Sequence, residues 1–384
     1  MKPALQFELV ATDGVARAGQ LRLGPTTVQT PVFMPVGTQA TVKTQTPAEV
    51  AGTGARLILA NTYHLMLRPG AELVARMGGV GQWMGWPHAL LTDSGGYQVF
   101  SLAELREIQE EGVAFRSHLD GSKHMLTPER SMEVQALLGA NIAMLFDECP
   151  PGGADRTVIG RAVERTSRWA ARCLQVPAPA HQVRFGIVQG GTHVDLRLAH
   201  LQEIAELPCE GIALGGFSVG EPIADMYRVL AEIGPQMPPN RPHYLMGVGK
   251  PIDLLRAIGS GIDMFDCVLP TRNARNGQAL TWRGRVNLKQ ARHREDKRPL
   301  CEQCGCPVCA NYSRSYLRHL IRAGEALGGR LLTEHNLHFF HELTAQARQA
   351  IVAGRYQDFA RIAEAQMLDG DEIGAPPASA AVTG

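Results

Sequence analysis

A single carboxylate stands at the end of a short apolar run and is followed by a basic turn. In residues 261–275 (GIDMFDCVLPTRNAR) the run ends on Asp266, Pro270 marks a turn, and Arg272 and Arg275 follow. This arrangement suits an enzyme that acts on a polyanion, because the carboxylate can react while the cations hold phosphates. A strand, a turn and a solvated edge would give the same pattern, so further signals are needed.

A second group of reactive residues has the composition of a metal site. Cys304, Cys306 and Cys309 lie close together, and His335 follows later in the chain. Three thiolates and one imidazole complete the tetrahedral coordination of Zn²⁺ and leave no position open for a substrate, which predicts a structural zinc site. The rival ligands are Cys301, His319, His338 and His341.

Basic residues are concentrated after Asp266. The whole chain carries 38 basic and 37 acidic side chains, for a formal net charge of +1, so any affinity for nucleic acid must come from a local patch. Residues 272–298 hold nine basic residues against two acidic ones. The nine are Arg272, Arg275, Arg283, Arg285, Lys289, Arg292, Arg294, Lys297 and Arg298. Beside a reactive carboxylate, this density predicts contacts with phosphates.

Eight short apolar runs must position these residues, and each ends in glycine or a reactive polar residue. The runs are residues 32–36, 57–60, 89–91, 142–146, 185–188, 211–214, 244–246 and 262–265. The segments between them are long enough for helices, which favours an α/β fold of the (β/α)8 TIM-type barrel over an open sheet. Active sites of such barrels lie at the carboxyl ends of the strands, where the sequence places Asp93, Asp147, Gln189, Gly216 and Asp266.

The remaining segments complete the predicted architecture. Residues 1–30 alternate apolar and polar residues around two turns, which predicts an N-terminal β-hairpin that covers one end of the fold. Residues 128–138 and 156–174 have helical patterns, and the first begins with a Thr127 cap and Pro128. We expect one catalytic domain over residues 1–368, with a zinc-binding subdomain at about 276–340, and a disordered tail over 369–384.

The composition limits the location of the protein. Hydrophobic residues make up 45% of the chain and charged residues 20%, which predicts a folded protein with a full-sized core. The N-terminus lacks the apolar segment of a signal peptide, and no stretch approaches the roughly 20 apolar residues of a membrane span. We therefore expect a cytoplasmic protein that does not bind membranes.

Several motifs in fixed order resemble one family. Residues 93–98 (DSGGYQ), 146–150 (FDECP), 188–191 (VQGG) and 263–272 (DMFDCVLPTR), with the cysteine and histidine set, are similar to those of the bacterial tRNA-guanine transglycosylases. The resemblance runs from the N-terminal hairpin to about residue 368. It implies an irregular (β/α)8 barrel with a zinc-binding insertion, which agrees with the count of strands.

The resemblance also implies an activity. Members of this family exchange guanine at the anticodon wobble position of tRNA for a 7-deazaguanine base, here 7-aminomethyl-7-deazaguanine, as a step toward queuosine. By this resemblance, Asp266 is the nucleophile and Asp93 the general acid and base. The expected base-binding residues are Ser94, Gly95, Gly96, Tyr97, Asp147, Cys149, Gln189, Gly216, Val219 and Met246.

Within this set the resemblance assigns separate tasks. Asp147, Gln189 and the backbone of Gly216 would hold the polar edge of the base, and Tyr97 and Met246 would sandwich its faces. Cys149 and Val219 would help to choose the substituent of the base, and a valine at 219 matches the bacterial choice of a small aminomethyl group. Residues 217–218 (Phe-Ser) depart from the commoner Leu-Ala.

The partners expected from the family are a tRNA with a wobble guanosine, the free base, one structural Zn²⁺ per subunit and a second copy of the chain as a homodimer. Two segments would contact the anticodon stem-loop. Their residues are Gly247, Val248, Gly249, Lys250, Pro251, Ile252, Asp253, Thr271, Arg272, Asn273, Ala274 and Arg275.

The proposed exchange makes opposite demands on the two carboxylates. Replacing a base with retained configuration requires two displacements, and the first forms a covalent bond between Asp266 and the ribose. Asp266 must therefore be ionised, which a nearby arginine or backbone donors would favour. Asp93 must give and take a proton, so we expect a raised pKa there.

Three alternatives remain open at this stage. An archaeal-type transglycosylase would modify the tRNA core, but such enzymes usually carry C-terminal RNA-binding domains, for which this sequence leaves no room. A non-catalytic partner of an active transglycosylase would usually lack catalytic motif residues, whereas Asp93 and Asp266 stand in intact motifs. A zinc-ribbon RNA-binding protein with an unrelated hydrolytic barrel is the third.

Overall fold

The protein folds around a closed parallel barrel, as the computed structural model of residues 4–102 and 106–370 shows. All eight predicted runs form its strands. They are β4 (Val32–Pro35), β5 (Leu57–Ala60), β6 (Ala89–Thr92), β10 (Ile142–Met144), β11 (Val183–Val188), β12 (Gly211–Leu214), β13 (His243–Leu245) and β14 (Met264–Cys267). The hydrogen-bonded order is β4-β14-β13-β12-β11-β10-β6-β5, and a bridge between Val36 and Leu59 closes the ring. The predicted fold class is confirmed.

Alternate residues of these strands point inward and fill the barrel. One continuous apolar cluster joins Met34, Leu91, Met144, Ile187 and Met264 from five of the strands. Because parallel strands in such a barrel are buried on both sides, they have nearly unbroken apolar sequences, which is why the runs were recognisable. The interior is therefore a packed core, and the open site must lie beyond the ends of the strands.

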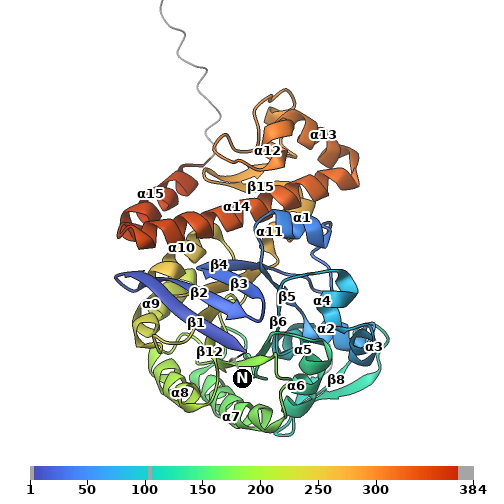
Figure 1. Ribbon diagram of the computed structural model, residues 1–384, viewed down its shortest axis with the longest axis vertical. Helices are drawn as coiled ribbons and strands as arrows, with labels where there is room; N and C mark the ends of the chain where they lie inside the picture. The colour runs from blue at the N-terminus through green and yellow to red at the C-terminus, as the bar shows by residue number, and fades with distance from the viewer. Residues whose placement is uncertain (1–3, 103–105, 371–384) are drawn as a thin grey trace, which may run out of the picture.

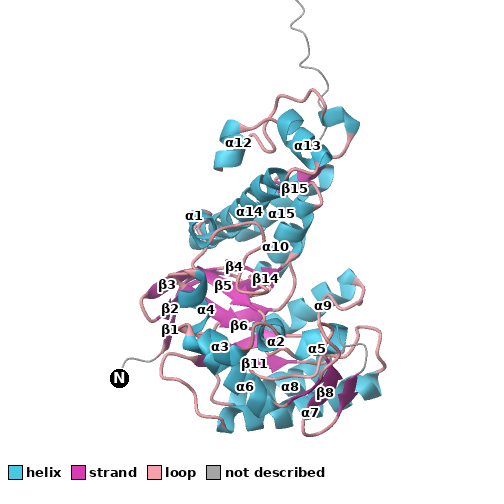
Figure 2. Ribbon diagram, turned by 90° about the vertical axis from the view of Figure 1, so that its right-hand side faces the viewer, coloured by secondary structure: helices cyan, strands magenta, loops and turns pink. Residues whose placement is uncertain are grey.

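Helices surround the strands and cross between them (Figures 1 and 2). They are α1 (Pro47–Gly52), α2 (Thr62–Leu67), α3 (Ala71–Arg76), α4 (Gly79–Met84), α5 (Gly96–Leu102), α6 (Pro128–Leu137), α7 (Arg156–Gln175), α8 (Val194–Glu206), α9 (Ile223–Ile233), α10 (Pro251–Gly259), α11 (Leu269–Arg275) and a 3-10 turn, η1 (Gly234–Gln236). The start predicted for α6 is confirmed: the Thr127 hydroxyl accepts a hydrogen bond from the Arg130 N–H at 3.1 Å, and Pro128 occupies the first helical position.

The N-terminal segment forms three antiparallel strands around the two predicted turns, one strand more than a simple hairpin has. The strands are β1 (Leu5–Asp13), β2 (Ala16–Leu23) and β3 (Thr26–Thr30). A second turn at Gly24, where φ is +57°, returns the chain into β3. Leu21 and Val28 join the apolar cluster inside the barrel. Arg17 of β2 pairs with Asp263, which precedes β14, at 3.2 Å. The sheet therefore covers the amino ends of the barrel strands and leaves their carboxyl ends accessible.

A second small sheet between β6 and α6 had no counterpart in the sequence analysis. Its strands are β7 (Arg106–Ile108), β8 (Val113–Arg116) and β9 (Lys123–Leu126).

The C-terminal part adds a compact subdomain to the barrel. It contains β15 (Gln278–Thr281), β16 (Gly284–Asn287), the 3-10 turn η2 (Ala291–His293), α12 (Pro307–Asn311) and α13 (Arg314–Ala323), followed by α14 (Ala326–Val352) and α15 (Tyr356–Asp369). In Figure 1, α14 runs between the barrel and the segment with α12 and α13. Phe340 of α14 packs on Phe33 of β4 with ring centres 4.5 Å apart, and the Asn336 side chain bonds to the backbone of Pro270, Gln278 and Leu280.

Helix α14 thus joins both parts. The subdomain has its own apolar cluster, and the treatment of residues 1–368 as one domain stays a prediction. Asp369 is still helical, one residue past the predicted boundary, and the rest of the predicted tail from 371 lies outside the described residues. Within residues 4–102 and 106–370, no helix combines the length and apolar character that a bilayer crossing requires.

Candidate active site

A cavity of about 620 Å³ lies at the carboxyl ends of the barrel strands. All five residues predicted at the strand ends line it, namely Asp93, Asp147, Gln189, Gly216 and Asp266. Five other residues of the predicted base site do so too: Ser94, Tyr97, Cys149, Val219 and Met246. Gly95 and Gly96 do not line the cavity. A Cβ on Gly96 would lie 2.6 Å from the Asp147 carbonyl oxygen, so this glycine permits close backbone packing behind the site.

Two donors hold one oxygen of Asp266. Its Oδ1 accepts hydrogen bonds from the Tyr244 hydroxyl at 2.6 Å and from the Gly247 N–H at 2.7 Å. Burial raises the pKa of Asp266 above its ordinary value, and these two hydrogen bonds oppose the rise. Of the two expected kinds of partner, an arginine or a backbone donor, the structure has the backbone donor, and no ion pair of Asp266 occurs in the part of the chain that the structure describes. The tyrosine hydroxyl is an additional donor.

Asp93 directly follows β6 and is held on both oxygens. Asn61 donates its side-chain amide to Oδ2 at 2.5 Å, and the Thr62 N–H donates to Oδ1 at 2.7 Å. Burial raises the pKa of Asp93 to about 6, these donors lower it, and the negative charge of Asp266 raises it. The direction agrees with the expectation for a group that gives and takes a proton.

Sequence reasoning missed Asn61 and Tyr244 as parts of this site. Asn61 directly follows the run 57–60, so its position at a strand end was a usable signal. Tyr244 lies inside an apolar run and is fully buried, so nothing in the sequence separates it from a core residue.

A hydrogen-bonded group forms another wall of the cavity. Asp147 accepts from the Ser94 hydroxyl on Oδ1 at 2.9 Å and from the Gln189 side-chain amide on Oδ2 at 2.7 Å. Burial raises the pKa of Asp147 to about 6, against these donors. The Gln189 Oε1 atom is buried and has no partner among the described residues. Gly216 adopts a φ of +68°, and a Cβ there would lie 2.4 Å from that oxygen, so only glycine fits.

A tight loop closes the side of the cavity near Val219. The Glu221 carboxylate accepts from the Ser218 N–H at 2.5 Å and from the Val219 N–H at 3.0 Å. Ser218 has a φ of +56°, a conformation that L-residues seldom adopt. Cys149 faces the same region, and burial raises the pKa of its thiol to about 12.

Known proteins share this sequence over nearly its whole length. A family model described as "Queuine tRNA-ribosyltransferase" matches residues 12–367. The Queuine tRNA-ribosyltransferase of Sorangium cellulosum is 62% identical over 360 residues, which cover 94% of this chain and 91% of that protein. Those of Sphingopyxis alaskensis and Fusobacterium nucleatum are 53% and 52% identical, over 94% of this chain and 97% of each relative.

The chain belongs to the queuine tRNA-ribosyltransferase family. This membership confirms the resemblance drawn from the motifs, and with it the enzyme class, a pentosyltransferase.

The segments expected to contact RNA in this family divide into exposed and buried residues. Lys250, Arg272 and Arg275 are exposed, and Lys250 and Arg272 also line the cavity. The side chains of Val248 and Asp253 are buried. Buried too are Thr271 and Ala274, while Pro251, Ile252 and Asn273 are half-buried.

Several of these residues have structural contacts instead. Asp253 accepts a hydrogen bond from the Tyr227 hydroxyl at 2.6 Å, and the Gly247 N–H is bonded to Asp266. Gly249 packs so closely on Cys267 that a Cβ would lie 2.1 Å from the Cys267 Cβ. The exposed cations are therefore the side chains of the two segments best placed to meet phosphates.

The predicted metal ligands converge, as expected for this family. The ligand atoms of Cys304, Cys306, Cys309 and His335 all lie within 4.8 Å of one another. The three sulfurs lie 3.8, 3.4 and 3.3 Å from His335 Nδ1, close to the spacing of about 3.6 Å that tetrahedral Zn²⁺ gives between sulfur and nitrogen ligands. The other ring nitrogen of His335 lies 3.0 Å from the Leu280 carbonyl, a partner that orients a metal-binding imidazole.

The rival ligands take little part in this cluster. Cys301, His319 and His341 do not belong to any metal-like group within residues 4–102 and 106–370. His338 forms a second possible group with Glu342 and Cys304, whose sulfur is shared with the first. The largely buried three-cysteine, one-histidine set fits a soft divalent metal better than this half-buried mixed set.

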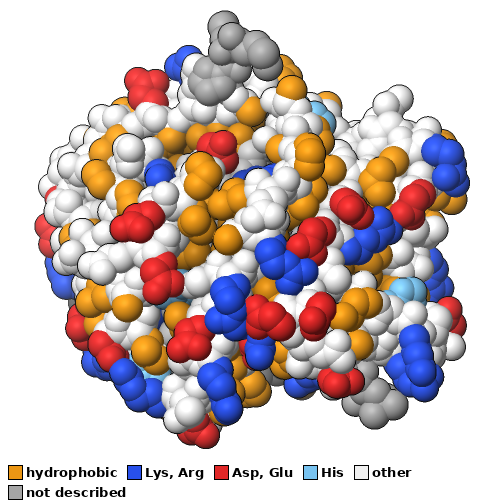
Figure 3. Space-filling model, turned by 90° about the horizontal axis from the view of Figure 1, so that it is seen from below, with side chains coloured by type: hydrophobic (Ala, Val, Ile, Leu, Met, Phe, Trp, Pro, Cys, Tyr) orange, Lys and Arg blue, Asp and Glu red, His pale blue; other side chains and the backbone are white. Residues whose placement is uncertain are grey.

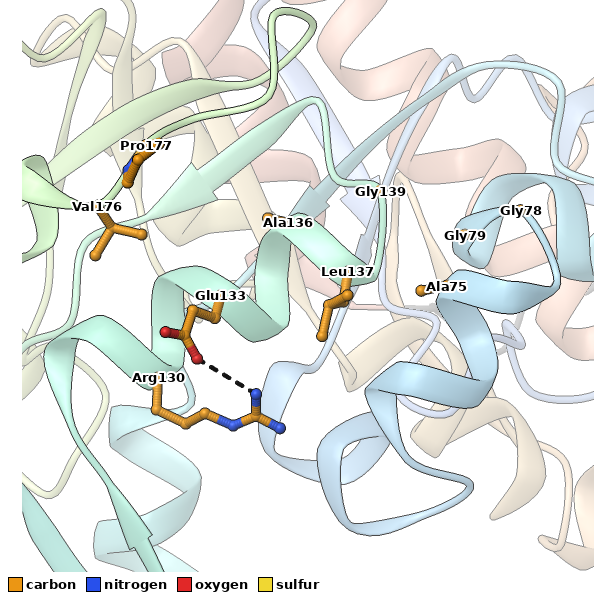
Figure 4. A pocket seen from close by; sticks show the side chains of 10 residues that line it. All are labelled: Ala75, Gly78, Gly79, Arg130, Glu133, Ala136, Leu137, Gly139, Val176 and Pro177. Atoms are coloured by element: carbon orange, nitrogen blue, oxygen red, sulfur yellow. Dashed lines mark hydrogen bonds and ion pairs between the residues drawn. The ribbon is translucent and has the colours of Figure 1, made fainter.

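A second hollow, of about 700 Å³, lies on the outside of the barrel (Figure 4). It is lined by α3, α4 and α6, and its main charged group, Arg130, is paired with Glu133 at 3.4 Å and with Glu72 at 2.6 Å. The face of the molecule seen from below in Figure 3 likewise mixes acidic and basic side chains. This hollow has none of the residues predicted for the base site or for the basic run, and the face in Figure 3 shows no concentration of basic side chains.

Proposed function

We propose that this protein is a tRNA-guanine transglycosylase, which exchanges guanine at the anticodon wobble position for 7-aminomethyl-7-deazaguanine. The observation that carries the proposal is the pair of buried carboxylates, Asp93 and Asp266, which face one cavity together with donors and acceptors suited to a guanine edge. Family membership supports the reaction class, and the cavity supports these residues as its agents.

In the first displacement, an oxygen of Asp266 attacks C1′ of the ribose and the bond from C1′ to N9 of guanine breaks. Because Oδ1 is bonded to Tyr244 and Gly247, Oδ2 is the oxygen left to attack. Asp93 gives its proton to the leaving guanine. In the second displacement, Asp93 removes a proton from the incoming base, the base nitrogen attacks C1′, and the Asp266 carboxylate is released.

The Asp147 wall would select guanine by its hydrogen-bond pattern. Asp147 can accept hydrogen bonds from the two donors on the edge of guanine. The Gly216 N–H and the Gln189 side-chain amide can donate to the carbonyl of guanine. Since Gln189 now donates to Asp147, its amide must turn toward the base on binding. Adenine presents the opposite pattern and would leave these buried groups unpaired.

The raised pKa of Asp93 leads to a stability prediction. Because the pKa is about 6 in the folded chain, against an ordinary value of 3.8 for a solvated aspartate, the folded protein holds this proton more tightly. The resulting stabilisation is complete below about pH 4 and is lost as the pH rises through about 6. We expect Asp93→Asn, which cannot ionise, to be more stable than the wild type at pH 8, by up to about 3 kcal/mol, and equal to it near pH 4.

The same variant should lose base exchange by about 10²- to 10⁴-fold. Thermal unfolding at both pH values and exchange rates check the two effects, and Glu111→Gln, which changes an exposed carboxylate, is the control. A variant less stable than the wild type at pH 8 would contradict the burial argument.

Binding of tRNA should depend steeply on salt. Arg272 is exposed at the cavity rim and forms no ion pair within the described ranges, so it is free to neutralise a phosphate. We expect Arg272→Ala to make the plot of log affinity against log salt shallower by about 0.7. Arg161→Ala, an exposed position on α7 outside the cavity, should leave the slope unchanged. Equal slopes for wild type and Arg272→Ala would remove this phosphate contact.

We propose further that the cysteine and histidine cluster binds one structural Zn²⁺, which the reaction itself does not use. The homodimer and the cytoplasmic location expected from the family remain proposals, which gel filtration with light scattering and cell fractionation can test.

The decisive test of function is incorporation of labelled guanine into tRNA. We expect incorporation into a tRNA with a wobble guanosine and none into the same tRNA with adenosine at that position. Label in both tRNAs would indicate the archaeal-type reaction at the tRNA core. Failure with both would contradict catalysis by this chain alone and favour the non-catalytic partner or the unrelated barrel.

A further inference from the structure

Helix α8 presents a fully buried arginine to the floor of the base site. Arg197 is 0% exposed and has no carboxylate within ion-pair distance in the described part of the chain. Burial lowers its pKa to about 9, so the guanidinium remains cationic at neutral pH. The guanidinium lies over the Phe217 ring, with 3.8 Å between the guanidinium carbon and the ring centre.

All the hydrogen bonds of this guanidinium go to backbone carbonyls at two neighbouring strand ends. Nε donates to Gly191 O at 2.6 Å, and Nη1 donates to Val188 O at 3.2 Å. Nη2 donates to Gly215 O at 2.8 Å and, more weakly, to Gly216 O at 3.5 Å. Burying a cation whose hydrogen-bond partners are all carbonyls costs free energy. This cost indicates that the cation has a role in holding these carbonyls, or the peptide units to which they belong.

One of these carbonyls belongs to the peptide unit that is expected to hold the base. The carbonyl of Gly215 and the N–H of Gly216 are part of one planar trans unit, so they point in opposite directions. When Arg197 fixes the carbonyl from behind, the N–H is aimed at the cavity. The Gly216 backbone, as a donor, opposes the rise in the pKa of the Cys149 thiol on the cavity wall, which agrees with that direction.

The charge also changes the strength of the donor. A cation bonded to the carbonyl draws electron density from the peptide unit, and hydrogen bonds in such a chain strengthen one another. The Gly216 N–H is therefore a stronger donor than a free amide. Only a ligand with an acceptor opposite this N–H gains from the effect.

The same helix also holds the peptide unit before Gln189. Arg197 bonds to Val188 O, and the Gln189 N–H donates to His200 Nδ1 at 2.9 Å. Arg197 and His200 are three residues apart and lie on one face of α8. Gly216 and Gln189 are the two residues proposed to donate to the base carbonyl. Side chains of α8 thus hold the backbone of both.

We infer that Arg197 is a positioning residue that makes the site selective for purines with a carbonyl at C6, by aiming and polarising the Gly216 N–H. The inference rests on the proposed function, because it assigns a cause to the guanine preference of that site. It predicts a coupling between Arg197 and the C6 carbonyl of the base, although the two never touch.

Two bases test this coupling. Guanine carries the C6 carbonyl, and 2-aminopurine, which is fluorescent, carries hydrogen there, so the affinity of each can be measured for wild type and variant. For Arg197→Met we expect guanine affinity to fall about 10- to 100-fold and 2-aminopurine affinity to change by less than about threefold. An equal fall for both bases would show a purely structural role and overturn the inference.

Three further measurements keep the test decisive. Arg184→Lys alters another buried arginine that donates to backbone carbonyls, at Cys173 O and Val176 O, but lies away from the cavity, and it should leave both affinities unchanged. If Arg197→Met fails to fold, Phe217→Leu removes the ring from the guanidinium and should lower guanine affinity alone, by a smaller factor. A wild type that does not bind guanine would instead contradict the proposed function.

Discussion

Replacing Asp266 with asparagine should reduce base exchange by at least about 10⁴-fold and abolish the covalent link between protein and tRNA. Asparagine keeps the size of the side chain and can still accept from Tyr244 and Gly247. It lacks the second carboxylate oxygen, which is the one left to attack the ribose. The loss would therefore report the nucleophile and not a collapsed site. Denaturing gels with labelled tRNA detect the link, and initial rates measure the exchange.

Two variants control this result. Tyr244→Phe removes one donor to Oδ1 but keeps the carboxylate, so it should retain the covalent link and lose activity by a smaller factor. Asp225→Asn alters a partly exposed carboxylate on α9 that is paired with Arg228 and lies outside the cavity, and it should behave as the wild type. A covalent link that survives in Asp266→Asn would transfer the role of nucleophile to another residue.

Replacing Cys309 with alanine should lower both the bound zinc and the stability of the protein. The four ligands tie the segment of Cys304 and Cys306 to His335 in α14, so the metal joins parts of the chain that are far apart in sequence. Because structural zinc contributes directly to folding, we expect a loss of several kcal/mol and a fall in melting temperature of about 10 °C. Zinc content by elemental analysis and thermal unfolding measure the two effects together.

Cys301 provides the matched control for the zinc prediction. It is buried near the cluster but is not among the converging ligands, so Cys301→Ala should keep one zinc per chain and lose only packing energy. Unchanged zinc in Cys309→Ala, or zinc lost from Cys301→Ala, would reassign the ligands.

The sequence was most informative where burial and chemistry coincide. The eight barrel strands were recognisable because strands buried on both faces are continuously apolar. Asp93 and Asp266 could be singled out because each stands at the end of such a run. The metal set was recognisable because its spacing is local, and the structure brings His335 to it through the tertiary fold.

What the sequence left hidden depends on contacts between distant segments. Tyr244 looks like any core aromatic until the fold places its hydroxyl on Asp266, and Arg197 looks like a helix-surface cation until α8 turns it inward. The sequence left open whether an arginine or a backbone donor would lie beside Asp266, and the loop after β13 delivers the backbone N–H.

Helix α14 fixes the distance and the relative orientation between the metal cluster and the barrel wall. His335 reaches the cluster and Phe340, five residues later, packs on β4. One inserted residue between them would turn one contact about 100° away from the other and shift it by about 1.5 Å. The chain can therefore change length in its loops but not in this turn and a half, which couples the evolution of the subdomain to that of the barrel.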